Sequence, residues 1–151
     1  MIRIYTDGAA QGNPGPGGYG TILKFNGHEK ELSEGFRLTT NNRMELLAVI
    51  KGLEAIKKDG IPVSIYSDSK YVVDAVEKGW LWTWEKKNFK DKANPDLWMK
   101  YIPLHKKFKP KFHWIKGHAG HVENERCDQL AVAAAESHHL LTDEWYERNQ
   151  S

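Results

Sequence analysis

Residues 2–27 read IRIYTDGAAQGNPGPGGYGTILKFNG, and this stretch decides the fold class. Residues Ile2 to Thr6 alternate and are rich in β-forming side chains, which predicts a strand. Residues Tyr19 to Phe25 are strand-like again, and Asn26-Gly27 is a strong signal for a two-residue hairpin turn. The returning strand is expected from Lys30 to Leu38. Strands in succession without an intervening helix predict antiparallel pairing at the start of the chain.

The glycines of this stretch also match a nucleotide-binding pattern, because residues 15–20 fit G-x-G-x-x-G. That pattern holds a phosphate only where it follows a strand and opens a helix, since the helix N-terminus binds the pyrophosphate. Here the strand-like residues 21–25 follow, and Pro14 and Pro16 remove N–H donors. A nucleotide-dependent oxidoreductase is therefore disfavoured. We expect a turn between two strands, beside Asp7, where glycine lets the backbone approach a ligand closely.

The rest of the chain alternates between helical and strand-like patterns. Helical patterns cover residues 42–58, 70–78, 94–107 and 122–136, and strand patterns cover residues 61–67 and 111–115. Asn42 is expected to cap the first of these helices, with Glu45 in the capping-box position. This order predicts an α/β fold with a mixed sheet, part antiparallel and part parallel, covered by helices.

Length and cysteine usage set the broad class. The 151 residues contain no repeat or low-complexity linker, so we expect a single domain over residues 1–151, with a polar, flexible tail from about residue 137. Cys127 is the only cysteine, no secretory signal opens the sequence, and no apolar run is long enough to cross a bilayer. A protein of a reducing compartment without a membrane partner is expected.

Charge is separated along the chain although the net charge is only +2. Between Lys78 and Lys111 there are ten lysines and three acids, a local balance of +7, so the remainder carries −5. This pattern is typical of a basic surface for a polyanion together with an acidic site elsewhere. A solvated lysine face would show the same local excess.

Two predicted strands end in an aspartate. Asp7 follows Tyr5-Thr6, and Asp68 follows Tyr66-Ser67. Ligand crevices of open α/β sheets form at the carboxyl ends of strands, which favours chemistry at both positions. An aspartate after a strand is also a common turn former or helix cap.

Two further acids border apolar helix faces. Glu45 lies one turn before Val49, and Asp128 borders the side of the last helix that carries Cys127 and Ala131. Four acids gathered at one sheet edge would repel one another unless a cation lay between them. Because carboxylates are hard oxygen ligands, the pattern indicates Mg²⁺ or Mn²⁺.

A glycine-rich loop between the last strand and the last helix carries His118. A histidine there can accept or shuttle a proton near neutral pH. A zinc site from His118, His121 and Cys127 is the alternative, but the spacing fits no zinc-ligand pattern.

Five separated segments, in this order, resemble bacterial ribonuclease H, type 1. They are YTDGAAQGNPGPGGYG (5–20), TTNNRMELLAVI (39–50), YSDSKYV (66–72), DLW (96–98) and KGHAGHVENERCDQLA (116–131). The resemblance implies a ribonuclease H-like fold with a five-stranded mixed sheet flanked by helices. It also implies hydrolysis of the RNA strand of RNA·DNA hybrids, with 3′-hydroxyl and 5′-phosphate ends.

The resemblance assigns roles to the acids and the histidine. Asp7, Glu45, Asp68 and Asp128 match the metal-binding acids, and His118 matches the loop histidine. Two Mg²⁺ ions per site are implied in the substrate complex, with Mn²⁺ as a substitute. The family also implies a cytoplasmic monomer that removes RNA primers and hybrids during DNA replication and repair.

Polar residues near the acids match family positions that contact the hybrid. Gly8, Asn13 and Asn41 match positions that face the minor groove, where the 2′-hydroxyl distinguishes RNA from DNA. Thr40 matches a position that holds a DNA-strand phosphate, and Asn42 is expected to cap a helix with a side contact to nucleic acid.

Residues 80–92 resemble the basic protrusion of the family, with Trp80, Trp84, Lys86 and Lys87 expected to contact the hybrid. The sequence departs from the pattern here, because the element is shorter and less rich in lysine than in long-handled members. Lys70 is a second departure, since glutamine is frequent at this position, and we expect its ammonium group to meet a phosphate.

Two other function classes remain open. An integrase or resolvase shares the fold, but the asparagines and the lysine-tryptophan element fit hybrid recognition better. A hybrid-binding module without catalysis would lack one of the acids, and Asp7, Glu45, Asp68 and Asp128 are all present.

Overall fold

A mixed sheet of five strands lies at the centre of the part of the chain that the computed structural model describes, residues 1–117 and 121–150. The strands are β1 (Ile2–Ala10), β2 (Gly15–Phe25), β3 (His28–Thr39), β4 (Val63–Ser67) and β5 (Lys111–Trp114). Their order is β3-β2-β1-β4-β5. β2 pairs antiparallel with β1 and β3, whereas β4 pairs parallel with β1 and β5. The predicted mixed sheet is confirmed.

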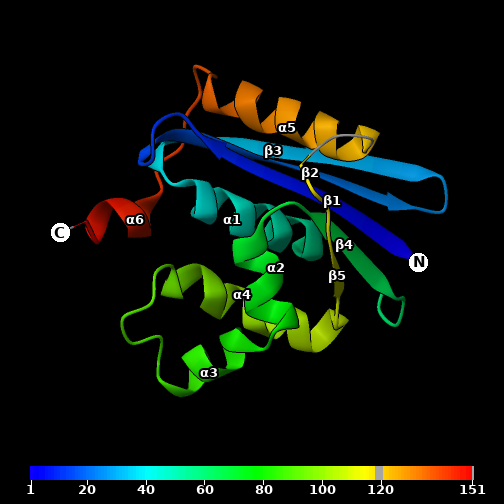
Figure 1. The fold of residues 1–151 in the computed structure, drawn as a ribbon. Coiled ribbons are helices and arrows are strands. Elements are labelled where there is room, and N and C mark those ends of the chain that lie inside the picture. The colour runs from blue at the N-terminus through cyan, green and yellow to red at the C-terminus, as the bar shows by residue number, and fades with distance from the viewer. Residues whose placement is uncertain (118–120, 151) are drawn as a thin grey trace.

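Helices cover both faces of the sheet (Figure 1). They are α1 (Asn41–Glu54), α2 (Lys70–Glu77), α3 (Trp80–Lys86), α4 (Pro95–Phe108), α5 (Val122–Ala135) and α6 (Glu144–Arg148). α5 packs against β1, β2 and β3 on one face, and α1 packs on the other face, between the sheet and α4. The sheet therefore lies between α5 on one face and α1 on the other, and α4 packs on the side of α1 that faces away from the sheet.

The core lies mainly under α1. Leu46, Val49, Ile50 and Leu53 are buried, and they meet sheet residues such as Ile4. Each such side chain contributes about 1.5–3 kcal/mol when it leaves water. This packing fixes α1 on the sheet, and with it the residues at its N-terminal end.

The glycine-rich stretch forms a strand, and the expected turn is shorter than predicted. β1 continues to Ala10 and β2 already begins at Gly15. The backbone of α5 lies directly over this part of β2. A Cβ on Gly18 would lie 2.5 Å from the carbonyl oxygen of Ala131, and one on Gly20 would overlap that of Cys127. The glycines are needed because α5 approaches the sheet more closely than any side chain allows.

The first turn of α1 differs from the prediction. Thr40, rather than Asn42, is the N-cap, and its hydroxyl accepts a hydrogen bond from the backbone N–H of Arg43 at 3.2 Å. A threonine at the N-cap satisfies one of the amides that a helix leaves unpaired. Glu45 is consequently outside the capping box, and its carboxylate is available to the sheet edge.

The segment described above as a tail packs on the body of the protein. Leu141 forms a parallel bridge with Phe36, donating from its N–H to the carbonyl of Gly35 at 2.8 Å. The short helix α6 follows, and its Glu147 pairs with Arg37 at 2.8 Å. These contacts connect the C-terminal segment to the edge strand β3.

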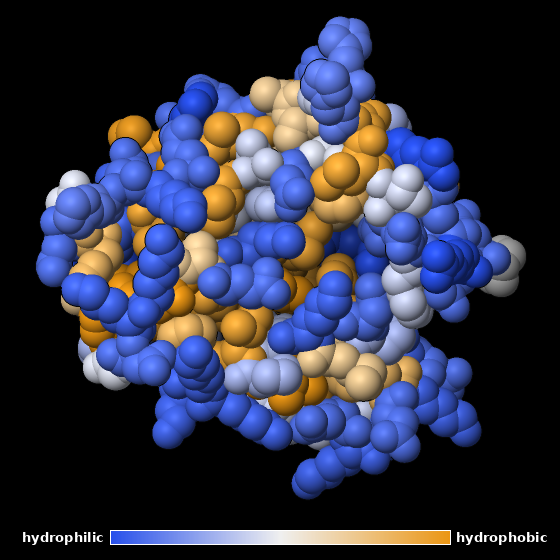
Figure 2. Space-filling model, turned by 180° about the vertical axis from the view of Figure 1, so that it is seen from behind, coloured by the Kyte–Doolittle hydropathy of each residue, from blue (hydrophilic) through white to orange (hydrophobic). Residues whose placement is uncertain are grey.

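Hydrophobic and hydrophilic residues are interspersed on the face drawn in Figure 2. Several large hydrophobic side chains are exposed, among them Met99, Val122 and Trp114. In the part of the chain that the structure describes, every helix is too short or too polar to cross a membrane.

Candidate active site

Three of the predicted acids lie together at one edge of the sheet. Asp7 comes from β1, Asp68 directly follows β4, and Glu45 lies in the second turn of α1. One carboxylate oxygen from each lies within 4.8 Å of the other two. β1 and β4 are parallel neighbours, so their carboxyl ends deliver the two aspartates to the same edge, as the sequence predicts.

Gly8 allows α1 to reach this edge. A Cβ on Gly8 would lie 2.5 Å from the carbonyl carbon of Met44 and would overlap the backbone nitrogen of Glu45. The backbone N–H of Gly8 also donates to Asp7 Oδ1 at 2.9 Å. Gly8 thus brings Glu45 beside Asp7, a packing role that the sequence analysis did not foresee. Its predicted contact with a minor groove remains a prediction.

The acids are held in an environment that disfavours their charge. Asp7 is 4% exposed, and Glu45 Oε1 is buried without a hydrogen-bond partner among the described residues. Burial and the negative charges of Asp7 and Asp68 raise the pKa of Glu45 well above its usual value, against the opposing effect of the Gly8 N–H. A bound cation would reduce the repulsion among the acids and would give Glu45 Oε1 a partner.

The donor set fits a hard divalent cation. Carboxylate oxygens are the ligands that Mg²⁺ and Mn²⁺ prefer. The three described side chains that form this cluster are all carboxylates. Cys127, which the zinc alternative needs, is buried and donates its S–H to the carbonyl of Tyr5 at 3.2 Å. Burial raises the pKa of that thiol, so the thiolate that zinc requires is disfavoured.

Of the other two predicted catalytic residues, the structure describes only Asp128. Asp128 lies on α5, partly buried, and is not one of the three acids that come within 4.8 Å of one another. His118 lies outside the described residues. Their roles therefore remain predictions.

The predicted minor-groove residues meet beside the acids. Asn41 Oδ1 accepts from the backbone N–H of Ala10 at 2.6 Å, and Asn13 Oδ1 accepts from the N–H of Asn41 at 3.2 Å. Asn13, Asn41 and Asn42 are exposed. The turn after β1 and the start of α1 thus present amides on one surface, next to the hydroxyl of the capping residue Thr40.

Lys70, two residues after Asp68, lies against a tryptophan that the sequence analysis missed. Its Nζ atom is 4.6 Å from the ring centroid of Trp114. The indole N–H of Trp114 donates to the backbone carbonyl of Asp68 at 3.1 Å. Trp114 is 43% exposed. The sequence held one clue to Trp114, because it stands at the carboxyl end of the last strand. Asp7 and Asp68 were found by the same reasoning about strand ends.

The predicted protrusion folds as the helix α3 and the turn after it. Trp80 is 46% exposed, with the ammonium group of Lys78 5.2 Å from its ring, and Lys86 and Lys87 are exposed. Trp84 is partly buried against the fully buried Trp98. Its role is thus at least partly in packing, whereas Trp80 and the lysines face solvent.

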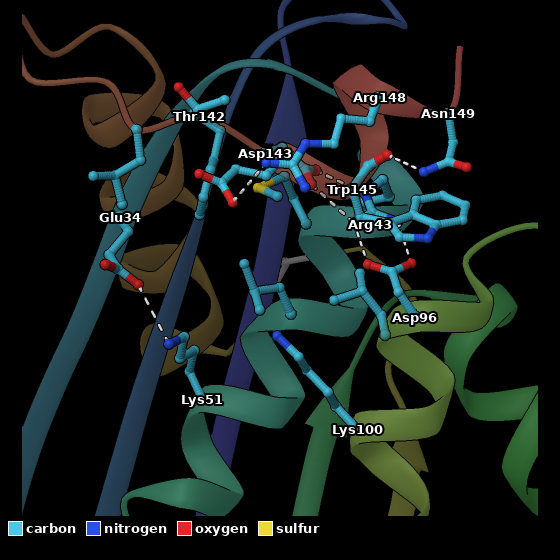
Figure 3. A pocket seen from close by; sticks show the side chains of 16 residues that line it. Glu34, Arg43, Lys51, Asp96, Lys100, Thr142, Asp143, Trp145, Arg148 and Asn149 are labelled. Carbon is cyan, nitrogen blue, oxygen red and sulfur yellow. Dashed lines mark hydrogen bonds and ion pairs between the residues drawn. The ribbon is translucent and has the colours of Figure 1, made fainter. Parts of the chain in front are cut away.

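A second acidic cluster, the Arg43 cluster, lies at the start of α1 (Figure 3). Arg43 is 2% exposed, and its guanidinium donates to Asp143 at 2.7 Å and to Asp96 at 2.8 Å. Trp145 packs over the guanidinium at 5.1 Å. These side chains border a cavity of about 630 Å³ that none of the predicted catalytic acids lines. The cluster fixes the α1 backbone two residues before Glu45.

Comparisons with known proteins point to one family. The family model described as RNase H matches residues 1–136. The Ribonuclease H of Desulforamulus reducens is 58% identical over 147 residues, covering 94% of this chain and 92% of that protein. The Ribonuclease H of Rippkaea orientalis is 55% identical, covering 97% and 92%.

Solved structures give the same result for the fold. LC9-RNase H1 superposes with a TM-score of 0.77 at 29% identity, covering 99% of this chain and 81% of that one. LC11-RNase H1 in complex with an RNA/DNA hybrid superposes with a TM-score of 0.69 at 27% identity, covering 90% and 97%.

Proposed function

The chain belongs to the ribonuclease H family, and from this premise we propose that it hydrolyses the RNA strand of RNA·DNA hybrids with two divalent cations bound at its acid cluster. The products would carry 3′-hydroxyl and 5′-phosphate ends. The observation that carries the proposal is the meeting of Asp7, Glu45 and Asp68 within 4.8 Å, with a buried oxygen of Glu45 that lacks a hydrogen bond among the described residues.

The acids act as cation ligands in this proposal. Asp7, Glu45 and Asp68 supply the converging oxygens, and Asp128 on α5 supplies a fourth carboxylate. When bound, a pair of ions lowers the pKa of an attacking water and stabilises the charge that develops on the leaving oxygen. Mg²⁺ is the expected ion, and Mn²⁺ can substitute because it accepts the same ligands.

His118 takes an auxiliary role, moving a proton or helping product to leave. The variant His118→Ala is therefore expected to cleave more slowly, yet measurably, in a single-turnover assay. General acid–base assistance contributes about 100–10,000-fold, so this range bounds the expected loss. A loss as complete as that of Asp7→Asn would exclude the auxiliary role.

The hybrid is recognised by the polar surface beside the acids. Asn13 and Asn41 present amides that can donate to and accept from a 2′-hydroxyl, next to Gly8. Thr40 and Lys70 are proposed to contact phosphates, with Asn42 as a side contact. This arrangement would distinguish the RNA strand by its sugar, rather than by its sequence.

The helix α3 supplies affinity in a second region. Trp80, Lys86 and Lys87 are exposed and are proposed to contact the nucleic-acid backbone, with the edge of Trp84 beside them. Contacts between lysines and phosphates weaken as the salt concentration rises, because the release of counterions from the nucleic acid is then less favourable. Binding through α3 should therefore be sensitive to ionic strength, whereas the choice of strand should not.

The cellular role that we propose is removal of RNA primers and other hybrids during replication and repair. The protein would act as a monomer in the cytoplasm, a reducing compartment that suits a chain whose single cysteine, Cys127, is buried.

One assay tests the proposal directly. A hybrid labelled on either strand is incubated with the protein in Mg²⁺ or in EDTA, alongside Asp7→Asn. The expected result is cleavage of the RNA strand only, in Mg²⁺ only, and by the unmodified chain only. Cleavage of the DNA strand would favour an integrase-like or resolvase-like enzyme, and hybrid binding without any cleavage would favour a binding module.

A further inference from the structure

The parallel pairing of β1 and β4 ends just before the acids. Its register runs from Ile2 opposite Val63 to Tyr5 opposite Tyr66. Asp7 and Asp68 each lie two residues beyond that last pair. The ladder between these two strands therefore does not itself set the separation of the two aspartates, and another contact must do so.

Asn124 on α5 makes that contact. Its side-chain nitrogen donates to the carbonyl oxygen of Thr6 at 3.4 Å and to that of Tyr66 at 3.2 Å. Thr6 directly precedes Asp7, and Tyr66 lies two residues before Asp68. One buried amide, 1% exposed, thus joins the two strands where their own hydrogen bonding ends. The bond to Tyr66 lies at the upper end of the ordinary N–H···O range, and the bond to Thr6 is longer.

The orientation of this amide is fixed by its surroundings. Asn124 Oδ1 is buried and has no hydrogen-bond partner among the described residues. Flipping the amide would place that oxygen against two carbonyl oxygens, so only the observed orientation makes the two bonds. Retaining a half-satisfied amide in a buried position carries a cost. A leucine there would avoid the cost but would leave the strands unjoined.

Asn124 also connects the strands to the fourth predicted ligand. It lies one helical turn before Asp128, so both project from neighbouring positions on the same side of α5. The bond from Cys127 to the carbonyl of Tyr5 holds the same helix to β1. The position of Asp128 relative to Asp7 therefore depends on where Asn124 holds α5.

We infer that Asn124 is a positioning residue, whose amide sets the spacing of Asp7 and Asp68 and the place of Asp128, and so sets the affinity of the site for divalent cations. The inference rests on the proposed function for the identity of the ligands. Groups that orient metal ligands without touching the metal typically change affinity or activity by about 10–100-fold when removed.

The test compares Asn124→Leu with the unmodified chain and with Tyr101→Phe. Tyr101 is also fully buried and loses one side-chain hydrogen bond, to His105 at 2.8 Å, but it lies on α4 and contacts none of the acids. Mn²⁺ affinity of the substrate-free protein is measured by electron paramagnetic resonance. Unfolding in EDTA, kcat and the KM for hybrid are measured beside it.

Asn124→Leu is expected to bind Mn²⁺ about 10–100-fold more weakly, with a lower kcat and an unchanged KM for hybrid. Tyr101→Phe should keep the affinity of the unmodified chain. If Asn124→Leu folds poorly, the Mn²⁺ affinity of Asn124→Ser is measured instead. Serine keeps one hydroxyl donor, so its Mn²⁺ affinity should be intermediate.

Two results would overturn the inference: Mn²⁺ affinity unchanged in the folded Asn124 variants, or the same loss of affinity in Tyr101→Phe. Asp7→Asn, assayed in parallel, separates this failure from failure of the proposed function. If Asp7→Asn still cleaves the hybrid, the proposed function itself is wrong, whatever the Asn124 variants do.

Discussion

Two positions in the first turns of α1, Arg43 and Glu45, lie among buried carboxylates that differ in how their charge is balanced. At Arg43, a guanidinium from the chain itself lies between Asp96 and Asp143, and every charge has a partner nearby. At Glu45, two residues later, three carboxylates face one another and the pKa of Glu45 is raised. The charges of the first cluster are compensated within the protein, whereas the second is a group of acids that could hold a metal ion.

The difference separates a structural site from a chemical one. Both clusters collect acids from distant parts of the chain, and both are largely buried. A carboxylate paired with arginine already has its charge balanced, so a further cation gains little there, while a carboxylate beside other carboxylates has a higher affinity for cations. Proximity of acids alone does not indicate a metal site. What matters is whether a positive side chain of the protein already balances their charge.

The largest effect is expected from Asp7→Asn. Losing a ligand of the cation pair removes several kcal/mol of transition-state stabilisation, so hybrid cleavage should fall by at least about 100–1,000-fold. Stability in EDTA should not fall, because the substitution removes one repelling charge. Initial rates and urea unfolding measure the two quantities. A destabilised Asp7→Asn would mean that the acids are compensated within the chain, as at Arg43.

Arg43→Met should show the reverse pattern. Removing one partner from a buried ion pair leaves Asp96 and Asp143 uncompensated, and typically costs about 3–5 kcal/mol of unfolding free energy. Urea unfolding measures this loss. Arg37→Met is the matched control, because its bidentate pair with Glu147 is exposed and should contribute no more than about 1 kcal/mol. Equal losses in the two variants would contradict the distinction between the clusters.

Mg²⁺ should stabilise the folded protein by binding at the cluster of Asp7, Glu45 and Asp68, and not at the Arg43 cluster. A ligand that binds only the folded state stabilises it by about 2.7 kcal/mol at a concentration 100 times its Kd. The unmodified chain should gain stability on addition of Mg²⁺ and lose it in EDTA, and Arg43→Met should keep this response. Asp7→Asn should lose it. Thermal melts with and without EDTA are sufficient, and a response that survives in Asp7→Asn would place the cation elsewhere.

The smallest effect concerns pH. Because the folded-state pKa of Glu45 lies above its usual value of 4.5, the folded chain binds more protons than the unfolded chain between those values. In EDTA, stability should therefore fall as pH rises from about 4.5 through the folded-state pKa. Glu45→Gln should flatten this part of the curve and be more stable than the unmodified chain at neutral pH. Urea unfolding across pH would refute this if the two curves fell in parallel.

The acid site was accessible to sequence reasoning because its parts carry local signals. Asp7 and Asp68 each follow a β-rich run, and parallel strands bring their carboxyl ends to one edge. Glu45 lies next to the apolar stripe of a helix that packs on the sheet. Each signal is short in sequence, and the geometry of an α/β sheet joins them.

Other features carried no such signal. Arg43 lies in a helical pattern like any surface arginine, and its partner Asp143 is 100 residues away in a polar segment. The glycine run of β2 resembles a turn until α5 is placed over Gly18 and Gly20. Asn124 lies among the polar residues that open α5, and its amide has a role only because the pairing of β1 and β4 ends beside it.

The sequence by itself determined the five strands and the helices α1, α2, α4 and α5, the edge at which Asp7, Glu45 and Asp68 meet, and the family to which the chain belongs. Periodicity and strand ends are local properties, so a few neighbouring residues are enough to encode them. The tertiary structure alone decided which buried acids are paired with an arginine of the chain and which face other acids. That outcome depends on distant side chains that meet only after folding, since electrostatic energy follows distance in space and burial, not separation along the chain.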